Sequence, residues 1–186
     1  DRVHNNDRLT TIVVGKGEHL VGGPYLRICS AMNIVGDPEV PKETIVVLGG
    51  IFFKKWIPRT CHLQHLTLRR AKRNGVIRGS SFTMVDVVVE QSCGWGVNAV
   101  CARVVGTCYN VEMRECGKSG VVAVQGACIT LIDTETIVTV DTGTRGTRSC
   151  IHVYTVSYTE YKSCVCVLRV LTCSLYKITP LNAFFI

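Results

Sequence analysis

The sequence predicts an all-β solenoid in which short parallel strands wind into coils of about 21–24 residues, that is, a parallel β-helix. Three observations indicate this fold: a strand-like composition, an internal repeat, and apolar residues that alternate within the repeats. Apolar residues make up 47% of the 186 residues, and Val, Ile and Leu dominate among them. With 17 Gly and only 5 Pro, the chain is typical of many short strands joined by tight turns.

The repeat consists of residue columns that share two spacings, a short step (Gly75 to Gly96) and a long step (Gly96 to Gly120). Steps of this length match one coil of three short strands and three turns, whose inward side chains stack into a core that no single coil could bury. The columns are Gly75-Val76, Gly96-Val97 and Gly120-Val121; Leu63, Met84 and Cys108; Leu66, Val87 and Val111; and Leu68, Val89 and Met113.

The alternation within each repeat predicts which side chains face the core. Val87 and Val89 are expected to point inward, so Val88 between them is expected to point outward. A Val88→Asp change should therefore be nearly silent, whereas Val87→Asp should be costly. A further short step extends the core columns in both directions, to Ile45, Val47, Ile129 and Ile132.

Polar columns with the same spacing support the stacking. One outward column alternates in charge, as expected for neighbouring strands about 4.8 Å apart, and another lies where strands begin. The charged column is Arg69, Glu90, Arg114 and Glu135, and the column at the strand starts is His65, Asp86 and Asn110.

A leucine-rich repeat has a similar length and is the second choice for the fold. Its consensus needs Asn or Cys three positions after the last Leu, and only one of the three residues found there, Ala71, Ser92 and Cys116, matches.

The segment Cys61–Ile132, with the C-x-x-x-G-V pattern of Cys116–Val121, resembles the repeat of the pectin-lyase-like superfamily. The opening Thr11–His19 and the following Leu26–Ile28 and Met32–Gly36 are similar to the first strands of such proteins. The resemblance covers roughly residues 10–133 and implies a right-handed parallel β-helix. Within that group, fold does not settle function, since members include lyases, hydrolases and carbohydrate-binding proteins.

The enzyme signatures of that superfamily are absent from this sequence. The nearest segment to the R-x-P-x-x-R pattern of pectate lyases is Arg145–Arg148, which lacks the proline and the spacing. The G-H-G segment and the paired aspartates of polygalacturonases do not occur. The resemblance therefore implies the scaffold and transfers no catalytic residue.

We expect two parts in the chain: a β-helix domain over residues 1–135 and an irregular, cysteine-rich apolar tail over residues 136–186. The repeat columns are lost from Thr136 onward, and the segment 150–186 carries four Cys and few charged side chains. Three interpretations of the tail stay open: a cap over the end of the solenoid, the remnant of a longer solenoid, or a surface for a partner.

Several classes of protein are not supported by the sequence. No long uncharged apolar run predicts a transmembrane segment, and no cofactor motif and no cellular compartment is indicated. The 11 Cys contain no C-x₂-C pair, and most are expected to act as small buried hydrophobes. No metal site is predicted. The candidate ligands Cys150, His152, Cys164 and Cys166 lack zinc spacing, because only one residue separates the last two. Cys61, His62 and His65 are expected in a strand, where Cys61 and His62 would point in opposite directions.

The charge distribution gives the main functional prediction. The net charge is +7, and the stretch between Glu43 and Asp86 contains eight Lys or Arg and no acidic residue. On a flat solenoid face such a stretch predicts a non-catalytic module that binds anionic carbohydrate or a protein partner. Nucleic acid is not expected, because the aromatic residues of the stretch do not alternate with the basic ones. The predicted ligand-binding residues are Arg69, Arg70, Lys72, Arg73 and Arg78.

The alternative prediction is a polysaccharide-degrading enzyme. Glu112 and Asp133 are one short step apart, which would place their carboxylates in one outward column about one strand spacing apart. Retaining glycosidases hold two carboxyl groups about 5 Å apart. Any stacked acidic pair meets this criterion, so the two residues are candidates on spacing alone.

Overall fold

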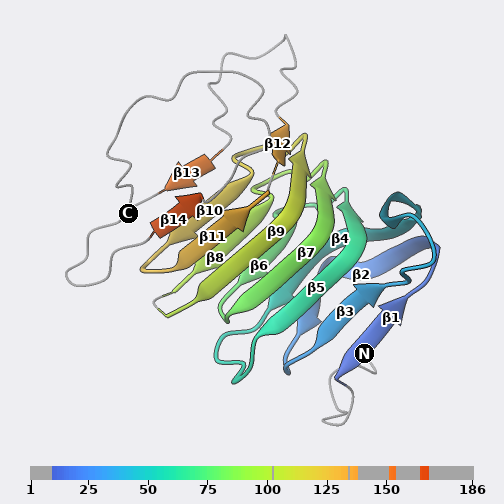
Figure 1. The fold of residues 1–186 in the computed structure, drawn as a ribbon, viewed down its shortest axis with the longest axis horizontal. Coiled ribbons are helices and arrows are strands. Elements are labelled where there is room, and N and C mark those ends of the chain that lie inside the picture. Colours follow the sequence, from blue (N-terminus) through green and yellow to red (C-terminus); the bar gives the residue numbers. More distant parts are fainter. Residues whose placement is uncertain (1–9, 102, 134, 138–150, 154–163, 168–186) are drawn as a thin grey trace.

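The chain forms a parallel β-solenoid of about five turns with essentially no helix (Figure 1). The computed structural model describes residues 10–101, 103–133, 135–137, 151–153 and 164–167. Among these residues, a single turn of 3₁₀-helix, η2 (Lys42–Thr44), interrupts the strands. None of the described segments is a helix with the length and apolar character needed to cross a bilayer.

The strands stack into three faces, which we name A, B and C in the order in which the chain visits them. Face A contains β1 (Thr11–Val14), β3 (Asn33–Gly36), the first halves of β5 (Cys61–Arg69), β7 (Phe82–Glu90) and β9 (Val105–Arg114), then β11 (Cys128–Ile132) and β14 (Cys164–Val167). Face B contains the first halves of β2 (Gly17–Ile28) and β4 (Ile45–Phe53), the second halves of β5, β7 and β9, and β12 (Glu135–Ile137). Face C contains the second halves of β2 and β4, then β6 (Val76–Arg78), β8 (Val97–Val100), β10 (Val121–Val124) and β13 (Ile151–Val153).

The register confirms the repeat in the middle of the chain. Val87 lies between Leu66 and Val111 in neighbouring strands, and all three side chains are fully buried. One coil earlier, Val47 pairs with Leu68, as the backward extension of the columns predicts. The inward columns of the three faces join into one hydrophobic core that runs along the solenoid.

The forward extension of the columns is wrong, because the offset from β9 to β11 is longer than the short step. Leu131, and not Ile129, continues the column of Cys108. Ile129 pairs with Gly106 and is buried, whereas Ile132 is only half-buried. The turns that join face C to face A differ in length from coil to coil, so the offset changes while the strands keep their pairing.

The longer offset corrects two predicted columns. Glu135 pairs with Glu112 and not with Arg114, so the alternation of charge ends at Arg114. Asp133 does not share a column with Glu112. It lies at the bend that follows β11, and its φ of 45° matches the 49° of Asn110 at the bend inside β9.

The bends between faces A and B use a left-handed backbone conformation at one residue per coil. His65 and Asp86 both have φ 53°, and Asn110 and Asp133 follow in the next coils. Asn and Asp adopt this conformation more readily than most residues do, which explains a polar column at this place. His65, Asp86 and Asn110 thus form a column as predicted, but the column lies at the bends in the middle of β5, β7 and β9 and not where these strands begin.

Val88 was expected to be a surface residue at which Val88→Asp is nearly silent, but only 1% of Val88 is exposed. Val88 does point away from the core, since the core cluster includes Val87 and Val89 but not Val88. The segment 37–44 folds back over face B and brings η2 against β5 and β7. Thr67, the register partner of Val88, donates its hydroxyl proton to the carbonyl oxygen of Lys42 at 3.0 Å. Val88 is thus buried under an insertion.

The described cysteines differ in environment. Cys61 and Cys108 are buried in the core, and Cys101 and Cys116 are partly buried. Cys29 and Cys93 are exposed, so the prediction of small buried hydrophobes fails for these two.

The described parts of the predicted tail extend the solenoid. β13 pairs in parallel with β10, and β14 pairs in parallel with β11 (Figure 1). Most residues of the predicted tail lie outside the described ones, and the three interpretations of the tail stay predictions.

Candidate functional site

The outer side of face B carries a row of ion pairs. Arg69 Nε lies 2.5 Å from Glu90 Oε1, and Arg69 Nη1 lies 3.7 Å from Glu18 Oε1 in an earlier coil. Arg114 contacts Glu90 at 4.0 Å and donates a hydrogen bond to Glu112. The predicted alternation of Arg69, Glu90 and Arg114 is confirmed. These charges satisfy one another, so the row offers little free charge to a ligand.

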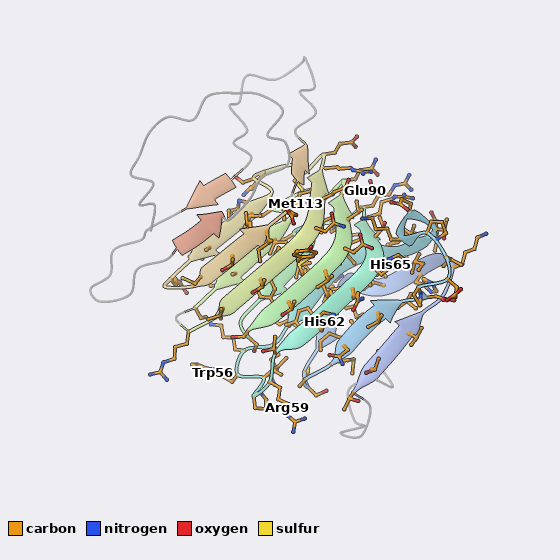
Figure 2. The ribbon with its side chains drawn as sticks, viewed as in Figure 1. Trp56, Arg59, His62, His65, Glu90 and Met113 are labelled. Carbon is orange, nitrogen blue, oxygen red and sulfur yellow. The ribbon has the colours of Figure 1, made fainter. Side chains whose placement is uncertain are left out.

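A second polar cluster lies where face A bends into face B, on the same side of the solenoid as Glu90 (Figure 2). His65 Nδ1 lies 2.6 Å from Asp86 Oδ2, and Lys42 Nζ lies 2.6 Å from Asp86 Oδ1. Asn110 Nδ2 donates to Asp86 Oδ1 at 2.9 Å, and Lys42 lies 3.7 Å from Glu112. Lys42 comes from the insertion over face B, so the cluster fastens this segment to two bends.

The cluster shifts two pKa values in opposite directions. The carbonyl of Val40 and then the carboxylate of Asp86 accept hydrogen bonds from the His65 ring and raise its pKa. Burial by itself would raise the pKa of Asp86, but hydrogen bonds from Lys42 and His65 outweigh burial and lower it. Both shifts favour an ion pair between a protonated His65 and an ionised Asp86.

The described residues contain no group of three or more side chains placed to hold a metal.

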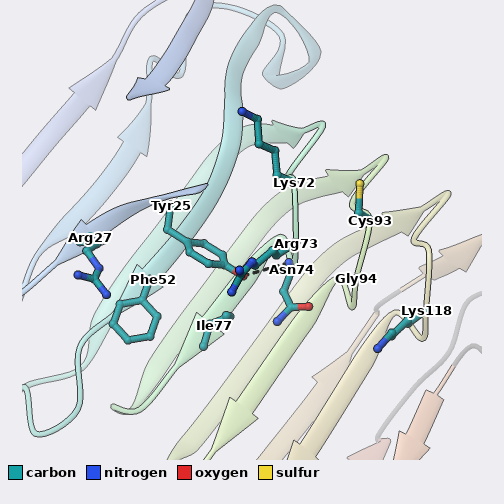
Figure 3. Close-up of a pocket in the computed structure, with 10 residues that line it drawn as sticks. All are labelled: Tyr25, Arg27, Phe52, Lys72, Arg73, Asn74, Ile77, Cys93, Gly94 and Lys118. Atoms are coloured by element: carbon teal, nitrogen blue, oxygen red, sulfur yellow. Dashed lines mark hydrogen bonds between the residues drawn. The ribbon is translucent and has the colours of Figure 1, made fainter. Parts of the chain in front are cut away.

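A groove of about 510 Å³ opens on the outer side of face C, beside the turns that lead into it from face B (Figure 3). Four of its ten lining residues are cationic and none is acidic. The lining residues are Tyr25, Arg27, Phe52, Lys72, Arg73, Asn74, Ile77, Cys93, Gly94 and Lys118. They come from five consecutive coils, so the groove follows the solenoid axis.

The groove is built by stacking of the turns that precede β6, β8 and β10. The amide of Gly94 donates to the carbonyl oxygen of Arg73 at 2.6 Å, and the amide of Lys118 donates to that of Gly94 at 3.0 Å. These three residues are separated by the same short and long steps as the core columns. A Cβ at Gly94 would lie 2.2 Å from Asn74 Oδ1, which accepts a hydrogen bond from the Trp95 amide, so a side chain here would displace the Asn74 amide. Along this column the cationic side chains of Arg73 and Lys118 are thus separated by Gly94, which has no side chain.

Aromatic side chains lie beside the cations of the groove. The Arg27 guanidinium lies 5.5 Å from the centre of the Phe52 ring, and Lys118 Nζ lies 4.6 Å from the centre of the Trp95 ring. The Tyr25 hydroxyl accepts a hydrogen bond from the amide of Asn74 at 3.2 Å, drawn as a dashed line in Figure 3. These contacts hold side chains of several coils in place.

The structure divides the predicted ligand-binding residues. Lys72 and Arg73 line the groove, whereas Arg69 belongs to the row of ion pairs on face B. Arg70 is exposed at the bend that follows β5, and Arg78 ends β6 in register with Phe53 and Ala99. The side chain of Arg78 lies outside the described part of the structure.

The sequence-based interpretation missed Tyr25, Arg27, Phe52 and Lys118. Lys118 could have been found, because it stands at the repeat position of Arg73, two coils later. The other three come from the first two coils, whose turns differ in length from those of the central repeat, so spacing gave no signal for them.

The alternative catalytic pair is not brought together as its spacing predicts. Glu112 pairs with Glu135 in the sheet and contacts Arg114 and Lys42, whereas Asp133 lies at a bend. Glycosidase activity of these residues stays an untested prediction.

No protein-family model, no curated protein and no solved structure matches this chain.

Proposed function

We propose that this chain is a non-catalytic β-helix module, of the pectin-lyase-like kind, that binds acidic carbohydrate in the groove on face C. The observation that carries the proposal is the lining of the groove: four cations, no carboxylate, and the rings of Tyr25 and Phe52. Carboxylate or sulfate groups would meet the cations, and the apolar faces of sugar rings would pack on the aromatic rings. The absence of lyase and hydrolase signatures from the sequence favours binding over catalysis.

A glycan array probed at low and at physiological salt tests this proposal. We expect binding to uronic-acid or sulfated glycans that weakens as salt rises, because the lining cations are exposed and screened. The Lys72→Gln/Arg73→Gln variant should weaken binding severalfold. No binding to any anionic glycan at either salt would overturn the proposal.

The matched control removes the same charge outside the groove. Lys54 and Lys55 are exposed on the loop between β4 and β5, from which Trp56 and Arg59 project (Figure 2). Lys54→Gln/Lys55→Gln should leave affinity close to that of the parent. Equal loss in both double variants would mean that the overall field of the protein attracts the glycan and that the groove does not bind it.

Cys93 offers a second measurement, because its exposed thiol lines the groove whereas the exposed thiol of Cys29 does not. Bound glycan should slow alkylation of Cys93 and leave Cys29 unaffected, as read by peptide mass spectrometry. Equal protection of both thiols, or tighter binding of a single-stranded oligonucleotide or a protein than of any glycan, would count against a carbohydrate site.

A further inference from the structure

We propose that one edge of the solenoid, the C–A edge, binds an anionic lipid bilayer, with the Trp56 ring in the headgroup region and basic side chains against the headgroups. This site is separate from the groove on face C and is independent of the carbohydrate proposed there. The C–A edge consists of the turns that lead from face C to face A, which are residues 29–32, 54–60, 79–81, 101, 103–104 and 125–127 of the described chain.

Trp56 is both highly exposed and held in an unfavourable backbone conformation. Its side chain is 81% exposed, and its φ of 68° lies in the left-handed region. Among the described non-glycine residues with positive φ, Trp56 is the only one with a large apolar side chain. A bulky residue is strained in this conformation, which Gly would adopt without cost. Neither the turn nor the core accounts for a Trp here, and strained residues of this kind gather at functional sites.

The loop that carries Trp56 is fixed to the solenoid on both sides of the ring. The Lys54 amide donates to the carbonyl oxygen of Ile28 at 2.9 Å, and the Ile57 amide donates to Ser80 Oγ at 2.9 Å. The Ser80 hydroxyl in turn donates to the carbonyl oxygen of Lys54 at 2.6 Å, and the Ile57 side chain is buried in the core. The backbone thus holds Trp56 as a fixed projection from the solenoid (Figure 2).

The C–A edge carries positive charge only. Its charged side chains are all exposed, and no ion pair joins any of them to another described residue. They are Lys54, Lys55, Arg59 and Arg103. The next residue after the last turn cation, Val105, is apolar at the start of β9 and 55% exposed, so it adds a second apolar side chain to the edge.

The acidic side chains of the described chain lie elsewhere, on face B, at the bends on either side of it and in the segment 37–44. Each coil has three faces, so face B lies across the solenoid from the C–A edge; Figure 2 shows Glu90 and His65 on one side and Trp56 and Arg59 on the other. An anionic surface would therefore attract the C–A edge and keep face B turned away from itself.

A projecting Trp between basic residues fits a bilayer better than it fits a nucleic acid. Trp is enriched at membrane interfaces, where its ring sits at the level of the headgroups. Lys and Arg side chains beside it would cover apolar surface with their stems and meet anionic headgroups with their charges. Stacking of single-stranded bases instead uses several aromatic side chains along a groove. Among the described residues of the C–A edge, Trp56 is the only aromatic one.

Vesicles of phosphatidylcholine with about 30 mol% phosphatidylserine, compared with vesicles of phosphatidylcholine alone, test the proposal. We expect binding to the anionic vesicles only, weakening as salt rises. Lys54→Gln/Lys55→Gln should weaken it by about fivefold for each charge removed. Lys72→Gln/Arg73→Gln removes the same charge from the groove and should weaken it far less. No binding to the anionic vesicles, or equal loss in the two double variants, would overturn the proposal.

Trp56→Gly separates binding from folding. Gly relieves the backbone strain, so the melting temperature should equal or exceed that of the parent, whereas vesicle affinity should fall about tenfold. The matched control is Leu20→Ala, because Leu20 is 82% exposed on the face B half of β2, and vesicle affinity should stay unchanged. Unchanged vesicle affinity in Trp56→Gly would overturn the proposal, and a lower melting temperature would then assign Trp56 to the fold.

Fluorescence locates the ring directly, because Trp56 and Trp95 are the only two Trp of the chain. Trp95→Phe keeps an aromatic ring beside Lys118 and leaves Trp56 as the single emitter. Its emission should shift to the blue on addition of the anionic vesicles, and lipids brominated along the acyl chain should quench it. Unchanged emission from vesicle-bound protein would overturn the proposal. So would tighter binding of a single-stranded oligonucleotide than of the vesicles, lost in Trp56→Gly, which would assign the loop to nucleic acid.

Discussion

His65 Nδ1 lies 2.6 Å from Asp86 Oδ2, and the two residues occupy the same left-handed bend in consecutive coils. The other ring nitrogen of His65 lies 2.9 Å from the carbonyl oxygen of Val40. Both partners of the ring are acceptors, so the ring makes both hydrogen bonds only when it carries both protons. The contact therefore links the protonation of one side chain to the attachment of the segment that covers face B.

The first prediction concerns pH. Because the folded state raises the pKa of His65, this group stabilises the protein fully below its ordinary pKa of 6.5, and the contribution is lost as pH rises through the raised value. We expect the free energy of unfolding to fall by up to about 1 kcal/mol over this range, a small amount because the cluster is partly exposed. Urea melts at several pH values between about pH 6 and pH 9 measure it.

His65→Asn should remove this pH dependence, since Asn accepts the left-handed backbone but has no titrating group. The matched control is His62→Asn, because His62 hydrogen-bonds to Gln64 in its own strand. If the parent and His65→Asn lose stability in parallel above neutral pH, the linkage to His65 is refuted.

For Asp86 we predict that the free energy of unfolding depends on pH in the opposite direction, at acid pH. Its pKa is lowered in the folded state, so its contribution is present above the ordinary value of 3.8 and is lost as pH falls below it. Asp86→Asn should flatten the acid limb of the stability curve measured by thermal melts. If Asp86→Asn loses as much stability at acid pH as the parent, other carboxylates cause the loss and the prediction for Asp86 is wrong.

The second prediction concerns Val87 and Val88. Val87→Asp places a charge in the core and should cost several kcal/mol, enough to unfold a central coil and its neighbours. Val88→Asp, which the alternation alone predicts to be silent, should cost about 1–3 kcal/mol, because the insertion at residues 37–44 buries this position.

Two control substitutions accompany this pair. Val88→Thr keeps the shape of Val and adds an uncharged hydroxyl, so it should cost less than Val88→Asp. Thr83→Asp, on the outer side of face A where it is half-buried, should cost less than either Asp variant. A silent Val88→Asp in urea melts would mean that the insertion does not cover this position in solution.

The third prediction separates Arg69 from the groove. Arg69→Gln breaks two ion pairs on face B and should lower the free energy of unfolding by about 0.5–1 kcal/mol, less at high salt. Glycan affinity should stay unchanged, because Arg69 does not line the groove. If Arg69→Gln lost as much glycan affinity as Lys72→Gln/Arg73→Gln, Arg69 would have to be part of the binding site.

The sequence predicted the central coils well because in–out alternation and stacking are local properties that repeat with a fixed period. It failed where the chain departs from that period. The burial of Val88 depends on an insertion that leaves the chain two coils earlier, and the position of Asp133 depends on the length of one turn. The groove was found only in part, because Tyr25 and Phe52 line it from coils whose turns differ in length from those of the central repeat.

The last prediction uses a close contact inside the core. Gly106 pairs with Phe82, and a Cβ added at Gly106 would lie 2.2 Å from the ring atom Cζ of Phe82. The ring thus fills the space that a side chain at residue 106 would need, and Phe82 is only 1% exposed, so it has nowhere to move. Gly106→Ala should cost about 1–3 kcal/mol through overpacking.

The control is Gly15→Ala, where an added Cβ meets nothing within 4 Å, and this change should be nearly neutral. Phe82→Leu makes room at the same place, so Gly106→Ala should cost less in a Phe82→Leu background than in the parent. Urea melts of the four proteins in this double-mutant cycle give the coupling between the two sites directly. Strict additivity of the two changes would show that the ring of Phe82 does not occupy the space in front of Gly106, and the pairing of β7 with β9 would then need a different register.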